Sequence, residues 1–231
     1  MQQTAKRRPR WVKGNLVFLA ASVVLLALLV FAVAGDALAP IDPARQSLRS
    51  RLLPPGAESR LGIHWLGTDS VGRDVLSQII AGARPAIAVS AAAVALAVLV
   101  GVGLGMIAGY RSKRMADALL YVTNIQLAFP FFLLAVTVVG ILRPSIPLVI
   151  FVIALGCWVP FARIAYSETL VVVEQEYIEA VHVMRGSVPR ILFRHVLPNI
   201  LPNIVVLATF MLGSAIVMES GLSFVGLGVP T

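Results

Sequence analysis

Five charge-free apolar runs dominate this sequence of 231 residues. They are Leu16–Ala34, Ala86–Tyr110, Tyr121–Leu142, Ser145–Ala162 and Asn199–Met218. A helix needs roughly 20 mostly apolar residues to cross about 30 Å of hydrocarbon, and each run comes near that length. The runs are continuous rather than alternating at a period of two, which favours helices over the strands of a barrel. The sequence therefore predicts an all-α, polytopic transmembrane helical bundle.

The composition excludes several other classes of protein. Hydrophobic residues make up 58% of the chain and charged residues 13%, whereas a typical soluble domain has about 25% charged residues. The net charge of +8 does not indicate a nucleic-acid partner, because a nucleic-acid-binding domain does not carry apolar runs of this length. A single cysteine, Cys157, excludes a disulfide framework and is predicted to be a small buried apolar residue. The three histidines show no helical pairing, so no metal site is expected.

The first apolar run has two interpretations. The basic tail of residues 1–15 and the small residues Ala32-Val33-Ala34 resemble parts of a secretory signal peptide. The apolar core of a signal peptide usually has about 7–15 residues, and this run has 19. We therefore expect residues 16–34 to be retained as the first transmembrane helix.

The placement of Lys and Arg predicts the orientation in the membrane. The tail of residues 1–15 has five basic residues and no acid, and the connection Arg111–Arg114 has three basic residues. Both are expected in the cytoplasm, together with the connection at about residues 166–198. Residues 35–85 contain six basic and five acidic residues and are expected outside. We thus predict a multi-pass protein with a cytoplasmic N-terminus, whose core occupies residues 86–231.

The cytoplasmic connection has helical patterning. One apolar stripe is predicted at helical spacing, formed by Tyr177, Val181, Met184 and Val188. Gly186 and Pro189 supply a stop and a new start, so a second short helix is expected around 189–197, ending near Pro198. A helix on the membrane surface is one interpretation. The mixed signs of its charges favour a groove on a protein partner instead.

The external segment also predicts a helix, lying on the outer membrane surface. Thr68 or Asp69 would cap it, and it would run to about Gly82 with Val75, Leu76, Ile79 and Ile80 as its apolar face. A cation-binding loop is the weaker alternative, because the regular acidic spacing of an EF-hand is missing.

Glycines recur at every fourth residue within the second run, at Gly101, Gly105 and Gly109. This pattern predicts a ridge for close helix packing. A phosphate-binding loop is excluded there because no Lys-Ser or Lys-Thr pair follows. In the later runs, Pro130 is expected to kink the third span. Glu219 directly follows the fifth run. Pro130 and Glu219 are candidates for the transport path or for an interface.

Several motifs carry a resemblance to a known family. The segments are Leu66–Asp69, Gly72–Ser77, Ala128–Pro130, Glu176–Val181 with Ile191–Asn199, and Ser220–Gly228. In this order they resemble the permease subunits of ABC importers of the oligopeptide, dipeptide and nickel branch, with Glu176–Val181 as the "EAA" loop. Three features depart from the family pattern. Arg185 stands where the family has glycine, with Gly186 one residue later, and Val181 replaces the second alanine of the loop. The family also has a sixth span, whereas the apolar runs of this sequence predict five.

The resemblance implies a fold like that of type I ABC importer permeases and a function without catalysis. Such a permease works with a homologous second permease, two ABC ATPase subunits (or one used twice) and an external substrate-binding protein, all at the lipid bilayer of a bacterial inner membrane. ATP and Mg would be bound by the ATPase partners, and this chain would need no cofactor of its own.

The resemblance also assigns residues. The ATPase-coupling residues would be Tyr177, Glu179, Ala180, His182 and Gly186. The external contact candidates, toward the binding protein or the partner permease, are Asp69, Arg73 and Asp74, and a local helix-capping role is an equal alternative for Arg73 and Asp74. The implied cargo is di- or oligopeptides, with nickel complexes or glutathione as the alternative. A self-contained secondary transporter is a weaker interpretation, because the spans lack charges and an internal repeat.

Overall fold

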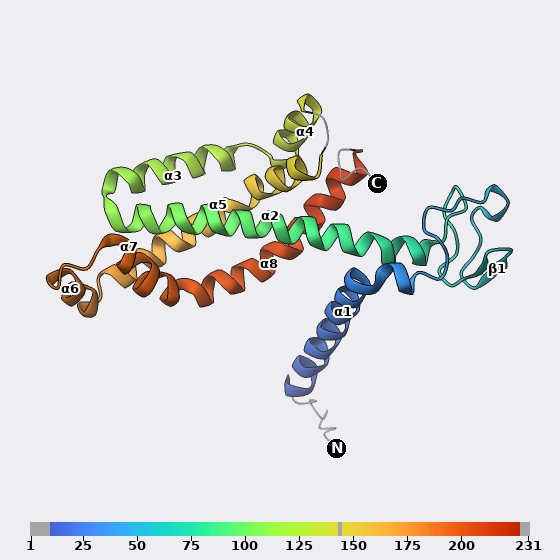
Figure 1. Ribbon diagram of the computed structural model, residues 1–231, viewed down its shortest axis with the longest axis horizontal. Coiled ribbons are helices and arrows are strands. Elements are labelled where there is room, and N and C mark those ends of the chain that lie inside the picture. The colour runs from blue at the N-terminus through green and yellow to red at the C-terminus, as the bar shows by residue number, and fades with distance from the viewer. Residues whose placement is uncertain (1–9, 143–144, 227–231) are drawn as a thin grey trace, which may run out of the picture. The chain divides into compact units, whose positions relative to one another are not determined.

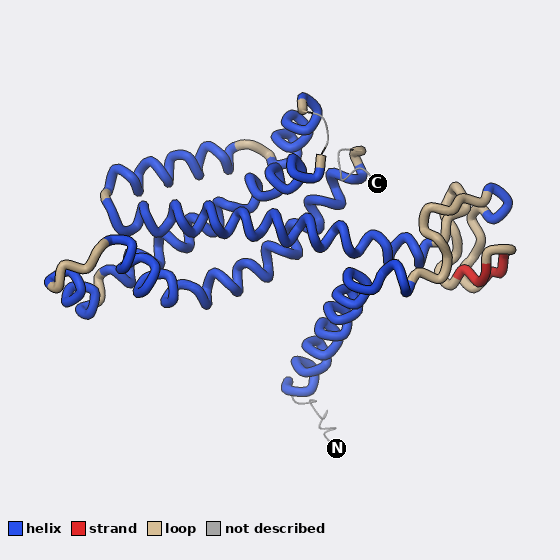
Figure 2. The backbone as a smooth tube through the Cα atoms, viewed as in Figure 1, coloured by secondary structure: helices blue, strands red, loops and turns tan. Residues whose placement is uncertain are grey.

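The computed structural model describes residues 10–142 and 145–226 of the chain (Figure 1). The chain divides into two compact units, residues 1–85 and residues 86–231. The helices are α1 (Arg10–Leu38), α2 (Val75–Arg111), α3 (Lys113–Ala128), α4 (Phe131–Ile141), α5 (Ile146–Val173), α6 (Glu176–Val183), α7 (Val188–Ile191) and α8 (Leu197–Phe224). Short elements complete it: a 3-10 turn η1 (Leu48–Ser50), strands β1 (Ala57–Ser59) and β2 (Gly62–His64), and a π-helical stretch η2 (Leu192–Val196). The predicted helical class is confirmed, and Figure 2 shows helix in nearly all the chain outside residues 39–74.

In the first unit, α1 contains the whole of the expected first span. Apolar side chains along it are exposed, such as Leu26 at 63% and Val33 at 85%, as suits a helix surrounded by lipid. Its C-terminal end lies against the first turns of α2. A Cβ atom placed on Gly35 would be 3.2 Å from the carbonyl oxygen of Ile80, so glycine permits this close approach.

The segment between α1 and α2 is a folded loop rather than a surface helix. Strands β1 and β2 form an antiparallel hairpin in which Ala57 lies opposite His64. Gly67 and Gly72 have positive φ angles of 78° and 80°. A Cβ on Gly67 would collide with the Leu53 carbonyl oxygen, and one on Gly72 with that of Ser47. Glycine is therefore required at both turns.

The predicted surface helix is wrong in both its bounds. It begins at Val75 rather than after Asp69, and it does not end near Gly82 but continues through Pro85 to Arg111 as α2. A glycine inside a helix costs only about 1 kcal/mol, which is too little to end a helix whose following residues are apolar. The surface helix and the second span are thus one helix.

In the second unit, α5 is the central helix. It packs against α3, α4, α6 and α8, and Phe161, Ile153 and Val149 on it are fully buried. The glycine ridge of α2 is confirmed and faces α5. Its three members approach the backbone of that helix at the carbonyl oxygens of Trp158, Ala162 and Tyr166. Cys157 is also fully buried, as the sequence predicts.

The third apolar run is not one kinked helix. It forms α3 and α4, which are bent by 84° at a break. Phe129 is extended (φ −94°, ψ 127°) and Pro130 caps α4. The reason is that a residue before proline is disfavoured in the helical region. The bend expected at Pro130 is present, but it separates two helices instead of kinking a single one.

Two boundaries on the predicted cytoplasmic side also differ. α5 continues eleven residues past Ala162 to Val173, so the connection starts later than expected. The second short helix does not end near Pro198, because helical structure is continuous from Val188 to Phe224. Pro198 lies within this continuous helix, two residues after the π-helical stretch η2, and does not end a helix. Among the described residues, α2, α5 and Val188–Phe224 are long and apolar enough to span a membrane, with α3 and α4 as a fourth candidate if they count as one span.

Candidate functional site

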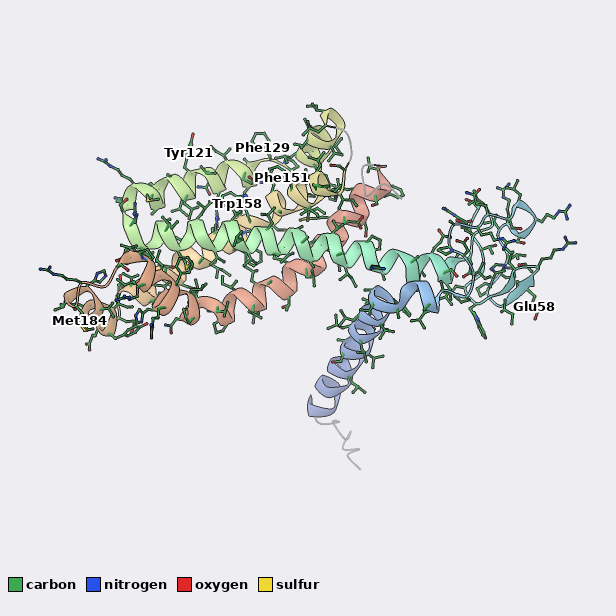
Figure 3. The ribbon with its side chains drawn as sticks, in the orientation of Figure 1. Glu58, Tyr121, Phe129, Phe151, Trp158 and Met184 are labelled. Atoms are coloured by element: carbon green, nitrogen blue, oxygen red, sulfur yellow. The ribbon has the colours of Figure 1, made fainter. Side chains whose placement is uncertain are left out.

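The helix α6 presents its exposed side at the end of the second unit. Glu179 and Ala180 are exposed, Val183 and Met184 are exposed at 79% and 74%, and Figure 3 shows Met184 at the tip. Ile178 is fully buried. The apolar stripe predicted through Met184 is therefore wrong. The helix has only eight residues, and it docks through Ile178 and the half-buried Val181.

Two of the expected coupling residues hold α6 to its neighbours. The Asn199 side-chain amide donates to the Tyr177 hydroxyl at 3.2 Å, and the rings of Tyr177 and His195 lie 6.2 Å apart. The His182 ring stacks on Tyr110 at the end of α2, with centroids 5.9 Å apart and planes 17° apart. These contacts connect α6 with the ends of α2 and α8.

The C-terminal end of α6 is a Schellman turn. The N–H of Gly186 donates to the Val181 carbonyl and that of Arg185 to the His182 carbonyl, both at 2.9 Å. Arg185 has a φ of 56°, which is the left-handed conformation that favours glycine. Gly186 has a different reason to be glycine, since a Cβ there would lie 2.5 Å from Val181 Cγ1. Together they explain the departure seen in the sequence: the turn keeps its geometry with arginine at the left-handed position.

In the loop between α1 and α2, Asp69 and Arg73 bind each other. Asp69 accepts hydrogen bonds from the backbone N–H groups of Val71 and Arg73 and from Arg73 Nε, each at 2.9 Å. Burial raises the pKa of Asp69, but the hydrogen bonds from Arg73, Val71 and Gln78 outweigh it and lower the pKa to about 2. Asp69 therefore organises the turn, while 40% of the Arg73 side chain remains exposed.

Asp74 is the N-cap of α2. Its Oδ2 accepts from the Ser77 backbone N–H at 2.8 Å and from the Ser77 hydroxyl at 2.7 Å. The expectation that Thr68 or Asp69 caps this helix is thus wrong. Thr68 instead accepts from the Leu53 N–H at 2.8 Å. Asp74 is only 1% exposed, so it is unavailable to a partner and is withdrawn as an external contact.

The sequence did not single out His64 as a functional residue, but it lies at the centre of this loop. It is fully buried, with Nδ1 2.9 Å from Asp74 Oδ1 and Nε2 2.8 Å from Ser59 Oγ. Burial raises the pKa of Asp74, but the hydrogen bonds from Ser77 and His64 and the charge interaction with His64 lower it overall.

Arg163, the residue directly after the fourth apolar run, is part of a helix–helix interface. It lies inside α5, and its guanidinium binds α3. Nη2 donates to Asn124 Oδ1 at 2.7 Å, and Nε and Nη2 lie 3.4 and 3.3 Å from Thr123 Oγ1. Nearby, the Gln126 amide donates to the Leu155 carbonyl at 2.7 Å. The interface of α3 and α5 is therefore partly polar.

The two path or interface candidates, Pro130 and Glu219, lie outside α6 and outside the loop between α1 and α2. Pro130 is exposed at the break between α3 and α4. Glu219 is 8% exposed on α8 and accepts a hydrogen bond from the Ser223 hydroxyl at 2.8 Å. Of the expected site residues, the structure brings together Asp69 with Arg73 in one loop and the five coupling residues at α6.

Comparison with known proteins identifies the family. The sequence profile described as "Binding-protein-dependent transport system inner membrane component" matches residues 101–231. The chain belongs to this family. It is thus a helical inner membrane component of a transport system, and the family resemblance predicted from the motifs is confirmed.

Relatives match most of the chain. The Bacillus subtilis dipeptide transport system permease protein DppC is 34% identical, over 95% of this chain and 67% of its own length. The glutathione transport system permease protein GsiD of Pectobacterium atrosepticum is 34% identical, over 92% of this chain and 69% of its own. The Escherichia coli nickel transport system permease protein NikC is 32% identical, over 90% and 74%. Permeases of this family are non-catalytic subunits that work with ATPase and substrate-binding partners.

Proposed function

We propose that this chain is the permease subunit of an ATP-driven importer, and that it forms, with a homologous second permease, a path for di- and oligopeptides across a bacterial cytoplasmic membrane. The proposal is supported by relatives named as dipeptide and oligopeptide permeases, at 34% and 29% identity over 95% and 94% of the chain. The positive-inside rule supports a cytoplasmic N-terminus and a cytoplasmic α6.

The observation that carries the proposal is the exposed tip of α6. Glu179, Ala180, Val183 and Met184 present two large apolar side chains beside a carboxylate. Exposed apolar side chains rimmed by polar groups occur at protein and membrane interaction sites, and the mixed charges of α6 favour a groove on a protein partner. Two ATPase subunits would bind ATP and Mg, and one would dock on each permease. The subunit docked on this chain would cover the tip of α6.

The contacts beneath the tip explain how docking would drive transport. Ile178 anchors α6 in the core, Tyr177 bonds Asn199 on α8, and His182 stacks on Tyr110 of α2. A displacement of α6 therefore acts on the ends of the spanning helices. Closure of the ATPase pair on ATP would then shift the bundle between inward-open and outward-open states. On the outer side, Asp69 and Arg73 are proposed as contacts for the binding protein.

The test replaces Ala180 with arginine in the complete transporter. Because Ala180 is exposed, the Ala180→Arg variant folds, but its bulky cation prevents docking. We expect loss of co-purified ATPase and of ATP-dependent peptide uptake. The controls are Ala180→Ser at the same site and Lys113→Glu at the α2–α3 turn, which lies at the same end of the unit (Figure 1); both keep the ATPase. Normal ATPase recovery and uptake with Ala180→Arg would refute the coupling assignment.

A further inference from the structure

Helix α5 carries a charged residue deep within its length. Its 28 residues extend about 42 Å at 1.5 Å per residue. Arg163 lies 17 residues after Ile146 and ten before Val173, or about 26 Å and 15 Å from the two ends. Since the hydrocarbon layer is about 30 Å thick, Arg163 lies within this layer or at its boundary.

The partners of Arg163 on α3 lie at a similar depth. Thr123 and Asn124 follow Lys113, the first residue of α3, by ten and eleven residues, which is about 15 to 17 Å along the helix. The guanidinium donates to both of these side chains. The cation is thus held across the α3–α5 interface instead of extending along α5 to the headgroups.

The charge of Arg163 is not neutralised within the part of the chain that the structure describes. Its acceptors there, Thr123 and Asn124, are both uncharged, and Nη1 has none. The Glu168 carboxylate accepts from Asn203 on α8 at 2.8 Å, and Asp117 lies seven residues before Asn124. An unneutralised charge inside a membrane faces a water-filled cavity or the bundle interior.

The surface beside Arg163 includes polar residues of α3, in contrast to the exposed apolar residues of α2 and α8. Asp117, Tyr121 and Asn124 recur on one side of α3 and are all exposed, and Figure 3 shows Tyr121 pointing away from α2. On α2 and α8, by contrast, Leu99 and Val206 are exposed at 74% and 70%. The apolar surface suits lipid, while the polar one suits water.

We propose that the polar face formed by Asp117, Tyr121, Asn124 and Arg163 lines the water-filled path, and that the Arg163 guanidinium binds a carboxylate of the passing peptide. The Nη1 edge of the guanidinium supplies N–H groups that can donate hydrogen bonds to a carboxylate. Such charge-assisted hydrogen bonds are stronger than hydrogen bonds between neutral groups. Every unmodified peptide has a C-terminal carboxylate, so the site recognises what peptides share. The binding of a peptide carboxylate rests on the proposed function, because it assumes a peptide cargo. The water-filled path along the polar face does not depend on which cargo is carried.

The test measures thiol labelling in the complete transporter with Cys157→Ala as background. Asn124→Cys is treated with anionic and cationic methanethiosulfonate reagents, with and without ATP, and each rate is normalised to that of a free thiol. We expect Asn124→Cys to react in at least one state, with the anionic reagent several-fold faster. Adding Arg163→Gln removes that preference. Leu99→Cys, on the exposed apolar surface of α2, is expected to stay unreactive, and Tyr121→Cys serves as a second reporter on the polar face.

Two results would overturn the inference. If Asn124→Cys and Tyr121→Cys are both as unreactive as Leu99→Cys, the face is covered and no water-filled path lies there. If they react but Arg163→Gln leaves the charge preference unchanged, Arg163 does not attract anions. Neither readout requires peptide uptake, so failure of the proposed function appears separately, as absence of uptake by the unmodified transporter.

A second arm tests the cargo contact. With ATPase recovery unchanged, Arg163→Gln is expected to lower uptake of an unmodified dipeptide about tenfold or more, as for loss of a charge-assisted hydrogen bond. Arg163→Lys keeps the cation and a substantial part of the uptake. Full uptake by Arg163→Gln, or equal loss in both variants, would show that the guanidinium does not bind the peptide carboxylate.

Discussion

At the scale of single residues, Arg185 shows how a local rule can be broken without loss of the structure around it. The left-handed conformation costs a residue with a Cβ roughly 1–2 kcal/mol. The Schellman hydrogen bonds of Arg185 and Gly186, and the packing of Val181 and Ile178 beneath them, hold the backbone in it all the same. The side chain of Arg185 is exposed, so it does not disturb this packing.

Replacing Arg185 with glycine should therefore stabilise the turn. We expect Arg185→Gly to slow hydrogen exchange at the amides of residues 185 and 186 by an amount equivalent to about 1 kcal/mol. The matched control is Gly186→Ala, whose Cβ would meet Val181 and should speed exchange at the same amides. Unchanged or faster exchange in Arg185→Gly would show that the φ angle of this residue carries no strain.

The residues of α6 show which features of the candidate site the sequence could predict and which it could not. The family motif placed Glu179 and Ala180 on a cytoplasmic helix, and both are exposed there. Periodicity chose Tyr177 and Met184 for the apolar face, whereas Ile178 is the buried residue. In an eight-residue helix several apolar residues compete for the buried side, and only packing against α5 decides among them.

At the scale of elements, the loop between α1 and α2 shows a similar limit. Thr68, Asp69 and Asp74 are all residue types that cap helices, and the sequence offered no reason to choose the last. His64, ten residues earlier in the chain, helps to fix Asp74 in place. Contacts between residues distant in sequence therefore decided where α2 begins. The break at Pro130, by contrast, was local and its position was predictable, although its 84° angle was not.

The loop should lose stability in acid. The pKa of Asp69 is lowered from 3.8 to about 2, so its carboxylate stabilises the folded loop fully above about pH 4. This stabilisation is lost as the pH falls through about 2. The lowered pKa of Asp74 acts in the same direction. We expect faster cleavage by pepsin within residues 48–66 as the pH falls from about 4 to about 2.

The control for this pH dependence is Asp69→Asn, which cannot titrate at that position. Its loop should be cleaved faster than the wild type at about pH 4, and its cleavage should change less across the same interval, after correction for the pH profile of pepsin. If the wild type and Asp69→Asn show equal pH dependence, Asp69 does not control the stability of the loop.

At the scale of the whole molecule, the glycine ridge of α2 offers a test of how the second unit is held together. α5 receives the ridge on one side, bears Arg163 toward α3, and leads into α6. A Cβ on Gly105 would collide with the Ala162 carbonyl oxygen and lie 2.7 Å from Ala165 Cβ. A Cβ on Gly103, in the same helix, would meet nothing within 4 Å.

These two glycines form a matched pair. Gly105→Ala should destabilise the protein by about 1–3 kcal/mol, as overpacking does, and lower the midpoint of thermal unfolding in detergent. Gly103→Ala should leave that midpoint unchanged or raise it, since alanine is favoured over glycine in a helix by about 1 kcal/mol. Equal effects of the two substitutions would mean that α2 does not pack on α5 through this ridge. Because α5 also carries Arg163 and leads into α6, the ridge is one of the contacts that hold this shared helix in place.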